Sequence, residues 1–178
     1  VINLNENQLE SKLNNIKKWE ARFLGILVSE GYISSINVKQ PYYRIGVANT
    51  DVQLIKDFRI GLEKLLKRVN ANSKITENEV HRINTSYVEM YTHSKALYEY
   101  LINERQFYFG SSVKEIPEVI LSANRSIQCE FLKYLYEGDG GINNGIEQKN
   151  IFYVSQSIKL LKQIQILLAN LGIFSYIS

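Results

Sequence analysis

The chain is poor in cysteine and in long apolar runs, and each shortage excludes a class of protein. One cysteine among 178 residues excludes an internal disulfide and a cysteine-rich zinc site. This residue, Cys129, lies among Ile127, Phe131 and Leu132, a pattern that predicts a buried core thiol rather than a nucleophile. No apolar run approaches the roughly 20 residues of a membrane span, and the N-terminus shows no signal-peptide core. These absences predict an intracellular protein, either cytoplasmic or associated with the nucleoid.

Familiar catalytic motifs are missing as well. The sequence has no Walker loop, no dinucleotide-binding glycine fingerprint and no defensible Ser/His/Asp grouping. Its two histidines, His81 and His93, lack the neighbours of a His-Asn-His nuclease site, so we expect them to be surface or strand residues. The net charge of +3, from 21 basic and 18 acidic residues, permits nucleic-acid binding without arguing for it.

Two stretches of the chain repeat one pattern, an apolar helix that ends in a small residue, an acid and a glycine. The first is FLGILVSEG at residues 23–31, and the second is LKYLYEGDG at residues 132–140. Their acids, Glu30 and Asp139, are 109 positions apart (139 minus 30), about the length of one compact structural unit. A single helix cap of this kind is ordinary, but two at this spacing indicate a duplicated helix–sheet module.

The glycines and acids of the two stretches suit closely packed helices that bind a cation. Glycine inside a helix costs about 0.5–1 kcal/mol relative to alanine, so Gly25 and Gly138 indicate backbones that approach closely. Each acid falls in a last helical turn, where the negative end of the helix dipole disfavours a carboxylate unless a cation compensates. We expect Gly31 and Gly140 to leave their helices in a left-handed conformation.

This arrangement resembles the LAGLIDADG family of homing endonucleases, in which two such helices pack side by side and present their acids to one DNA site. The resemblance implies an α+β fold, a pseudo-two-fold duplicated αββαββα unit with antiparallel DNA-binding sheets. It places a lead-in helix at residues 1–19, the first repeat at 20–103, a linker at 104–125 and the second repeat at 126–178. Compared with the first repeat, the second lacks a last strand and terminal helix, so we expect it to be incomplete at its C-terminus: either the chain is a fragment or its second half is reduced.

The hydrophobic periodicity follows the same order. Alternation over residues 32–48, broken at Gln40-Pro41, predicts a hairpin, and Asp51 predicts the start of a helix whose apolar stripe ends at Leu66. Strands are expected at residues 73–77 and 82–92, and a short helix at 94–103. The second half predicts a motif helix from residue 126, a hairpin at 141–155 that turns at Asn143-Asn144-Gly145, and a helix at 157–171.

Two further segments resemble blocks of intein-borne members of the family. Lys114-Glu115-Ile116-Pro117 resembles the lysine-containing block before the second motif, and LLANLGI at residues 167–173 resembles the closing helix block. The chain has neither an N-terminal Cys or Ser nucleophile nor a C-terminal His-Asn pair, which implies an endonuclease domain from or related to an intein. Three positions depart from the motif: Val28 replaces an acid, Glu30 replaces aspartate, and Tyr134 replaces a glycine and threatens the helix contact.

These residues predict metal-dependent hydrolysis of phosphodiester bonds, because paired metals activate a water molecule and stabilise the leaving oxygen. Glu30 and Asp139 are the expected catalytic carboxylates. With the carbonyl groups of Ser29 and Gly138 they would hold Mg²⁺ or Mn²⁺, hard ions that prefer oxygen ligands. The other candidates are Lys114, which would stabilise developing charge or orient water, and Asn49 and Gln156, which would hold water molecules around the metal.

The outward faces of the sheets are expected to contact double-stranded DNA over a long recognition site. A two-stranded ribbon fits the major groove, where Arg, Lys and Asn have distinct base partners. Alternation that turns Tyr43, Ile45 and Val47 inward turns Arg44 outward. The candidates are Ser35, Asn37, Lys39, Tyr42 and Arg44 in the first hairpin, Lys74, Thr76, Tyr87 and Tyr91 in the next strands, and Asn143, Asn144, Gln148 and Lys149 in the second half.

Two classes of function stay open. Both acids favour a site-specific double-strand DNA endonuclease, expected to be monomeric because the motif is duplicated within the chain and to have no membrane partner. The short second repeat and Tyr134 favour a non-cleaving nucleic-acid-binding protein on the same fold, such as a degenerate endonuclease, a maturase or a regulator. A plain interaction domain is a more distant alternative.

Overall fold

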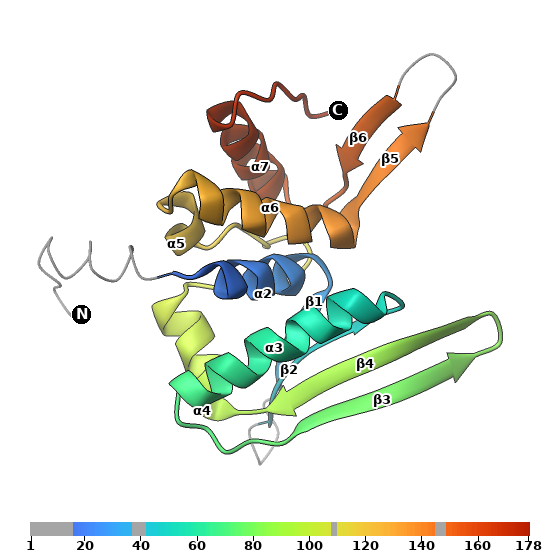
Figure 1. Cartoon of the computed structure of the whole chain (residues 1–178), viewed down its shortest axis with the longest axis vertical. Helices are drawn as coiled ribbons and strands as arrows, with labels where there is room; N and C mark the ends of the chain where they lie inside the picture. Colours follow the sequence, from blue (N-terminus) through green and yellow to red (C-terminus); the bar gives the residue numbers. More distant parts are fainter. Residues whose placement is uncertain (1–15, 37–41, 108–109, 145–148) are drawn as a thin grey trace, which may run out of the picture.

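Two helices lie side by side at the centre of the molecule (Figure 1). They are α2 (Lys18–Ser29) and α6 (Arg125–Asp139) of a computed structural model that describes residues 16–36, 42–107, 110–144 and 149–178. One continuous hydrophobic core joins both helices to the first sheet and to the C-terminal helix. The lead-in helix expected at residues 1–19 falls outside the described residues except at its end, where Lys18 and Trp19 already belong to α2.

The first half carries a four-stranded antiparallel sheet in the order β1-β2-β4-β3. Its strands are β1 (Gly31–Ile36), β2 (Tyr42–Asn49), β3 (Ile75–Arg82) and β4 (Thr85–His93). Between β2 and β3 runs α3 (Val52–Arg68), which Asp51 caps as predicted by accepting hydrogen bonds from the backbone N–H groups of Gln53 and Leu54. The helix predicted at 94–103 is α4 (Lys95–Glu99) continued by one π-helical turn, η1 (Tyr100–Glu104).

The second half repeats the first four elements of the first half, a helix, two strands and a helix, and its sheet has two strands in the described residues. A short helix, α5 (Glu118–Leu121), precedes α6, and the hairpin of β5 (Gly140–Asn144) and β6 (Lys149–Tyr153) leads to α7 (Ile158–Asn170). The prediction of a turn at Asn143-Asn144-Gly145 is wrong at its first two positions, because Asn143 and Asn144 are paired in β5, and Gly145 lies outside the described residues. The duplicated α+β fold with antiparallel sheets is confirmed.

Both sheets leave the central helices at the same end. In Figure 1, β1 follows the right-hand end of α2 and β5 follows the right-hand end of α6; the β5–β6 hairpin extends to the upper right, whereas β1 and β2 pass behind α3. Neither Gly31 nor Gly140 adopts the left-handed conformation that we predicted. They are required for space instead: a Cβ on Gly31 would lie 2.5 Å from the Leu27 carbonyl oxygen, and one on Gly140 would collide with Tyr136.

The expectation that Tyr134 threatens the helix contact is wrong, because Gly25 makes room for it. A Cβ on Gly25 would lie 2.7 Å from the Phe131 carbonyl oxygen and 3.1 Å from the Tyr134 Cβ, so the backbones of α2 and α6 touch at this point. The Tyr134 ring is buried, and its hydroxyl donates a 2.8 Å hydrogen bond to Asp57 of α3. Arg22 of α2 donates to the same carboxylate, so the tyrosine joins three helices rather than separating two.

Cys129 is exposed, against the prediction of a buried thiol. On a helix, residues two apart point to different faces, so the apolar Ile127 and Phe131 bury the face that Cys129 does not share. The histidines are exposed strand residues, as predicted. Within the part of the chain that the structure describes, no helix is long and apolar enough to cross a membrane.

Candidate active site at the ends of the paired helices

The two motif acids meet where α2 and α6 end. Glu30 follows the last turn of α2, its N–H donating to the Ile26 carbonyl, and Asp139 is the last residue of α6. A Cβ on Gly138 would lie 2.9 Å from the Glu30 Cγ and would clash with Ser29. The absence of a side chain at Gly138 therefore allows the two acidic helix ends to come together.

The charges at this site are crowded. Burial and then repulsion by Asp139 raise the pKa of Glu30, against the opposing effects of Lys114 and a hydrogen bond from Asn49. Burial likewise raises the pKa of Asp139, opposed by Lys114 and by a hydrogen bond from Tyr153. Two half-buried carboxylates whose pKa values are both raised need additional positive charge in order to be ionised together.

Lys114 supplies part of that charge. It comes from the linker, yet its Nζ donates a 2.7 Å hydrogen bond to the Ser29 carbonyl oxygen, immediately before Glu30. Its ammonium group lowers the pKa of both acids, so it interacts with both. The structure thus brings together all three residues expected to be catalytic. The Ser29 carbonyl, a predicted metal ligand, accepts from the lysine in this structure.

The predicted water-holding residues differ in their placement. Asn49, at the end of β2, hydrogen-bonds Glu30, and its Oδ1 accepts from the Asp51 N–H at 2.8 Å. Gln156 is exposed and, within the described ranges, makes no hydrogen bond to either acid. In the second half Tyr153 lies next to the acid instead, with its hydroxyl 3.3 Å from the Asp139 Oδ2.

Sequence reasoning missed Tyr153, although the strand register explains it. Tyr153 pairs with Gly140, the residue that follows Asp139, so the end of β6 returns directly to the acid. Burial first, and then the charge of Asp139, raise the pKa of Tyr153, which keeps its hydroxyl protonated as a hydrogen-bond donor. The signal was the sheet register, which cannot be counted from the sequence without knowing where the β5–β6 connection begins.

The donor set fits a hard divalent cation. The two acids and the Gly138 carbonyl offer only oxygen atoms, and Mg²⁺ keeps several water or phosphate oxygens beside one or two carboxylates. Within the described residues no group of three or more His, Cys, Asp or Glu side chains could enclose a metal by itself. A metal here would therefore be held by these two acids and completed by water and substrate.

The register of the first sheet places the predicted DNA-contacting residues. Arg44 pairs with Ser34 and His93, while Ser35 pairs with Tyr43, so the prediction that Ser35 shares a face with Arg44 is wrong. The alternation was displaced by one residue because its phase was set from Ile36, the last residue of β1, and from Val38, which lies outside the described residues, whereas the buried Ile33 gives the opposite phase. Thr76 pairs with Tyr91. The predicted residues Asn37, Lys39 and Gln148 lie outside the described residues.

Arg44 is held in a small cluster on the outer face of this sheet. Its guanidinium carbon lies 3.6 Å from the ring centre of Tyr91 and 5.4 Å from that of Tyr32. Its Nη2 lies 3.0 Å from Glu89, to which the Tyr32 hydroxyl also donates. The Nε is buried and has no hydrogen-bond partner among the described residues. Stacking and the ion pair therefore orient Arg44 before any ligand arrives.

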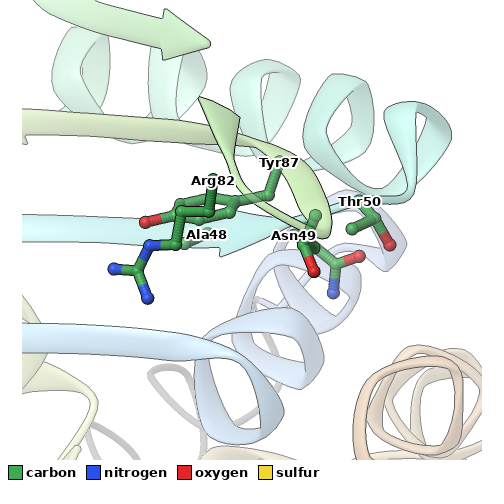
Figure 2. A pocket seen from close by; sticks show the side chains of 6 residues that line it. Ala48, Asn49, Thr50, Arg82 and Tyr87 are labelled. Carbon is green, nitrogen blue, oxygen red and sulfur yellow. The ribbon is translucent and has the colours of Figure 1, made fainter. Parts of the chain in front are cut away.

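A hollow of about 360 Å³ lies beside the same face (Figure 2). Arg82 and Tyr87 lie side by side over it, with the arginine carbon 5.5 Å from the tyrosine ring centre. Asn49, the neighbour of Glu30, lines its other side together with Thr50. Sequence reasoning named Tyr87 but missed Arg82, which is the last residue of β3 and pairs with Thr85, the first residue of β4.

The remaining candidates are dispersed. Tyr42 is exposed and its ring centre lies 4.2 Å from that of His93, at the end of the sheet away from the acids. Lys74 precedes β3, is exposed, and accepts a hydrogen bond from Thr92 through its carbonyl group. In the second hairpin Asn143 is exposed on β5, while Asn144 and Lys149 close the paired part of the strands.

Comparison with known proteins gives a family and relatives. The model of the LAGLIDADG-like domain matches residues 19–106 and 126–178. A DNA-directed RNA polymerase subunit of Methanocaldococcus jannaschii is 28% identical over 156 residues, covering 86% of this chain and 16% of the relative. An uncharacterized protein of the same organism is 32% identical over 161 residues, covering 89% of this chain and 17% of the relative. The chain thus spans about a sixth of these curated relatives.

Solved structures show the same fold. The homing endonuclease I-DmoI in complex with DNA and Mn has a TM-score of 0.60 at 23% identity, with 90% of this chain and 81% of that chain covered. The homing endonuclease I-WcaI bound to its DNA recognition sequence has a TM-score of 0.53 at 12% identity, with 95% and 75% covered.

Proposed function

Because the chain belongs to the family of LAGLIDADG-like domains, we propose that it is a site-specific double-strand DNA endonuclease that uses a divalent metal. The observation that carries this proposal is the convergence of Glu30, Asp139 and Lys114 between the two sheets. Two carboxylates with raised pKa values and an ammonium group next to them form a site suited to binding cations and phosphate.

Each residue of the site has a defined part in the proposed hydrolysis. Glu30 and Asp139 would hold Mg²⁺ or Mn²⁺, which when bound activates water and stabilises the leaving oxygen. Asn49 and Tyr153 orient one carboxylate each through hydrogen bonds. Lys114 lies next to both acids, where its positive charge would stabilise the charge that develops on the phosphate oxygens.

The partner that we propose is double-stranded DNA, bound along both sheets. The relatives of known structure were solved on DNA, which supports this partner. Arg44 and Arg82 supply positive charge on the outer face of the first sheet, and arginine binds guanine or phosphate with its planar fork. Since one chain contains both motif helices, we propose that it acts as a monomer, at an intracellular location where DNA is present.

The match to only a sixth of each curated relative supports a further part of the proposal. A domain that aligns with a small piece of much longer proteins fits an endonuclease domain from or related to an intein. The lysine-containing block and the closing helix block, which the sequence suggested, agree with this interpretation.

Two observations favour the second candidate function, a non-cleaving DNA-binding protein on the same scaffold. The Ser29 carbonyl that would help to hold a metal is bound by Lys114, and the second sheet has two strands within the described residues, against four in the first. A protein that retained the helix pair for stability alone would show both features.

Cleavage of a plasmid library with randomised inserts would decide between the two. The purified chain is incubated with the library in Mg²⁺, Mn²⁺, Ca²⁺ or EDTA, and linear products are sequenced. The proposal expects one family of sequences, cut in both strands with Mg²⁺ or Mn²⁺ and uncut in EDTA. Specific binding without cutting in any metal would establish the binder, and absence of both would overturn the proposed DNA function.

A further inference from the structure

Three consecutive residues of the linker are attached to the beginning of α7. The Ser157 hydroxyl donates a 2.6 Å hydrogen bond to the Lys114 carbonyl oxygen. Glu115 forms an ion pair with Lys159, and the Ile116 N–H donates at 2.8 Å to the side-chain oxygen of Gln163. The second half of the molecule therefore fixes the backbone at Lys114, although the side chain of that lysine extends to the first half.

Lys114 is thus held at two ends by different halves. Its carbonyl is bound by Ser157 of the second half, and its ammonium group by the Ser29 carbonyl of the first half at 2.7 Å. A lysine side chain has four flexible bonds, so a fixed backbone is needed to restrict where its ammonium group lies. The position of the charge between the two acids therefore depends on the hydrogen bond from Ser157.

The Ser157 hydroxyl makes two hydrogen bonds, one as an acceptor and one as a donor, so a substitution can remove one and keep the other. It caps α7 by accepting a 3.2 Å hydrogen bond from the Leu160 N–H, and it uses its single proton to bind Lys114. At the equivalent place in the first half, Asp51 caps α3 by accepting from two backbone N–H groups. An ionised aspartate has no proton to donate, so it can cap a helix but cannot bind a carbonyl oxygen.

We propose that Ser157 is a positioning residue for the proposed hydrolysis, acting through its hydrogen bond to the Lys114 carbonyl. This inference rests on the proposed function, since it assigns to Ser157 the task of placing the ammonium group that serves the site. The residue is fully buried, so it would act through Lys114 and not by touching substrate itself.

Three variants separate the positioning role from helix capping. Ser157→Ala loses both hydrogen bonds, whereas Ser157→Asp keeps the cap and loses the donor. Ser94→Ala is the matched control, because Ser94 is a buried serine that caps α4 through the Leu97 N–H and has no carbonyl partner among the described residues. Loss of a cap alone costs about 1 kcal/mol of stability, which thermal unfolding measures for each variant.

The first readout is single-turnover cleavage with saturating DNA. Misplacement of a reacting group by about 1 Å costs on the order of 100-fold, so Ser157→Ala and Ser157→Asp are expected to lose between 10- and 100-fold in rate. DNA affinity should stay unchanged, and Ser94→Ala should cut at the normal rate. Equal rate losses in Ser157→Ala and Ser94→Ala, or a normal rate in Ser157→Asp, would overturn the proposal.

The second readout does not need activity. Acetic anhydride labels free lysine amines, and mass spectrometry compares Lys114 with the exposed Lys133 in each protein. Release of the lysine in both Ser157 variants should raise the relative labelling of Lys114, with no change in Ser94→Ala. If the natural chain cuts no DNA but this labelling pattern is found, the proposed function fails while the attachment stands. Unchanged labelling in both Ser157 variants refutes the attachment itself.

Discussion

The two halves of the molecule are most alike at the acidic ends of α2 and α6 and least alike in their sheets. Each half brings one carboxylate, one close-packed glycine and one strand that starts directly after the helix. Yet the first sheet has four strands and the second, within the described residues, has two. The two halves are therefore most alike where one residue from each must reach the same point. They are least alike in their sheets, where the proposed DNA contact need not be divided equally.

Even at the site the likeness is chemical rather than exact. Glu30 receives its hydrogen bond from an amide, Asn49, and Asp139 receives its own from a phenol, Tyr153. Among the described residues, Lys114 has no counterpart from the other half in the proposed site. A pair of acids that is equivalent in charge but different in surroundings can serve two DNA strands at unequal rates, and substitutions can test this.

The largest expected effect is the loss of either acid. Asp139→Asn should reduce cleavage by about 10³-fold or more, as for residues that act as one catalytic unit, while specific DNA affinity is largely kept. Affinity persists because phosphate contacts elsewhere supply most of it. The measurement is single-turnover cutting of supercoiled plasmid, together with binding in Ca²⁺.

Glu30→Gln is the matched variant of the other half. If both acids are needed to cut both DNA strands, the two variants lose cleavage equally. If each acid is needed to cut one DNA strand, each variant accumulates a nicked circular plasmid, and the two variants are nicked in opposite DNA strands. Undiminished cutting by Asp139→Asn would contradict the role that we assign to this residue.

A smaller effect is expected from closing the space between the halves. In Gly25→Ala the new methyl group meets the Phe131 carbonyl, a backbone atom that cannot move aside. Overpacking typically costs about 1–3 kcal/mol, more than the roughly 0.5–1 kcal/mol that alanine adds to helix stability. Urea unfolding should show a net destabilisation, and cleavage should fall because the acids separate.

The control is Lys18→Ala, an exposed substitution on the same helix. It should leave both stability and cleavage near those of the natural chain. A Gly25→Ala protein that is as stable as this control would mean that α2 and α6 can separate without penalty.

The sequence predicted the features that depend on local pattern or on duplication. The helices, most strands and the pairing of Glu30 with Asp139 follow from periodicity and from two copies of one motif, whereas Lys114 was expected from the resemblance of its block to intein-borne members of the family. What failed depended on position in three dimensions. In the sequence Tyr134 looks too large for the helix contact, and only the structure shows that Gly25 lies opposite it. Tyr153 looks like an ordinary strand tyrosine, because its pairing with Gly140 cannot be deduced from the sequence.

The sheet face shows the same limit. Alternation correctly separates Arg44 from Tyr43 and Ile45, because β2 is continuous through all three. It fails for Ser35, because its phase was taken from Ile36, the last residue of β1, and from Val38, whereas the buried Ile33 sets the opposite phase. Periodicity is thus reliable where buried residues in the middle of a strand set its phase, and unreliable where residues at the strand end set it.

A third prediction concerns the half with the larger sheet. Arg44→Ala should weaken binding to the specific site by about 1–3 kcal/mol and relax discrimination at one base pair, with a smaller loss on non-specific DNA. The guanidinium is already stacked on Tyr91 and paired with Glu89, so little ordering is needed on binding. Competition between the matched site and its single-base variants, at fixed salt, measures the effect.

Arg44→Lys separates the possible contacts, because lysine keeps the charge but loses the planar fork. A base contact predicts that the lysine variant loses discrimination as well, whereas a phosphate contact predicts near-normal binding. Removing Arg44 also leaves Glu89 unpaired, so Arg44→Ala should be repeated in a Glu89→Gln background. Unchanged DNA affinity in both backgrounds would mean that Arg44 does not contact DNA and is only a solvated residue of the sheet face.

The smallest expected effect is a change in the thermal stability of the metal-free protein when either acid is replaced by its amide. Both have raised pKa values in the folded protein, so the fold binds their protons more tightly than the unfolded chain does. Their contribution to stability is full below the ordinary pKa values of 4.5 for Glu30 and 3.8 for Asp139, and is lost as the pH rises through the raised pKa values.

At neutral pH with EDTA, Glu30→Gln and Asp139→Asn should therefore melt at a higher temperature than the natural chain. Lys114 moderates the gain, which should vanish at low pH and shrink in Mg²⁺, because a bound metal stabilises only the natural protein. The exposed Glu63→Gln serves as control and should show no such dependence. A gain that persists unchanged across pH and metal would mean that the two acids are not crowded, and the site would lose its reason to bind a cation.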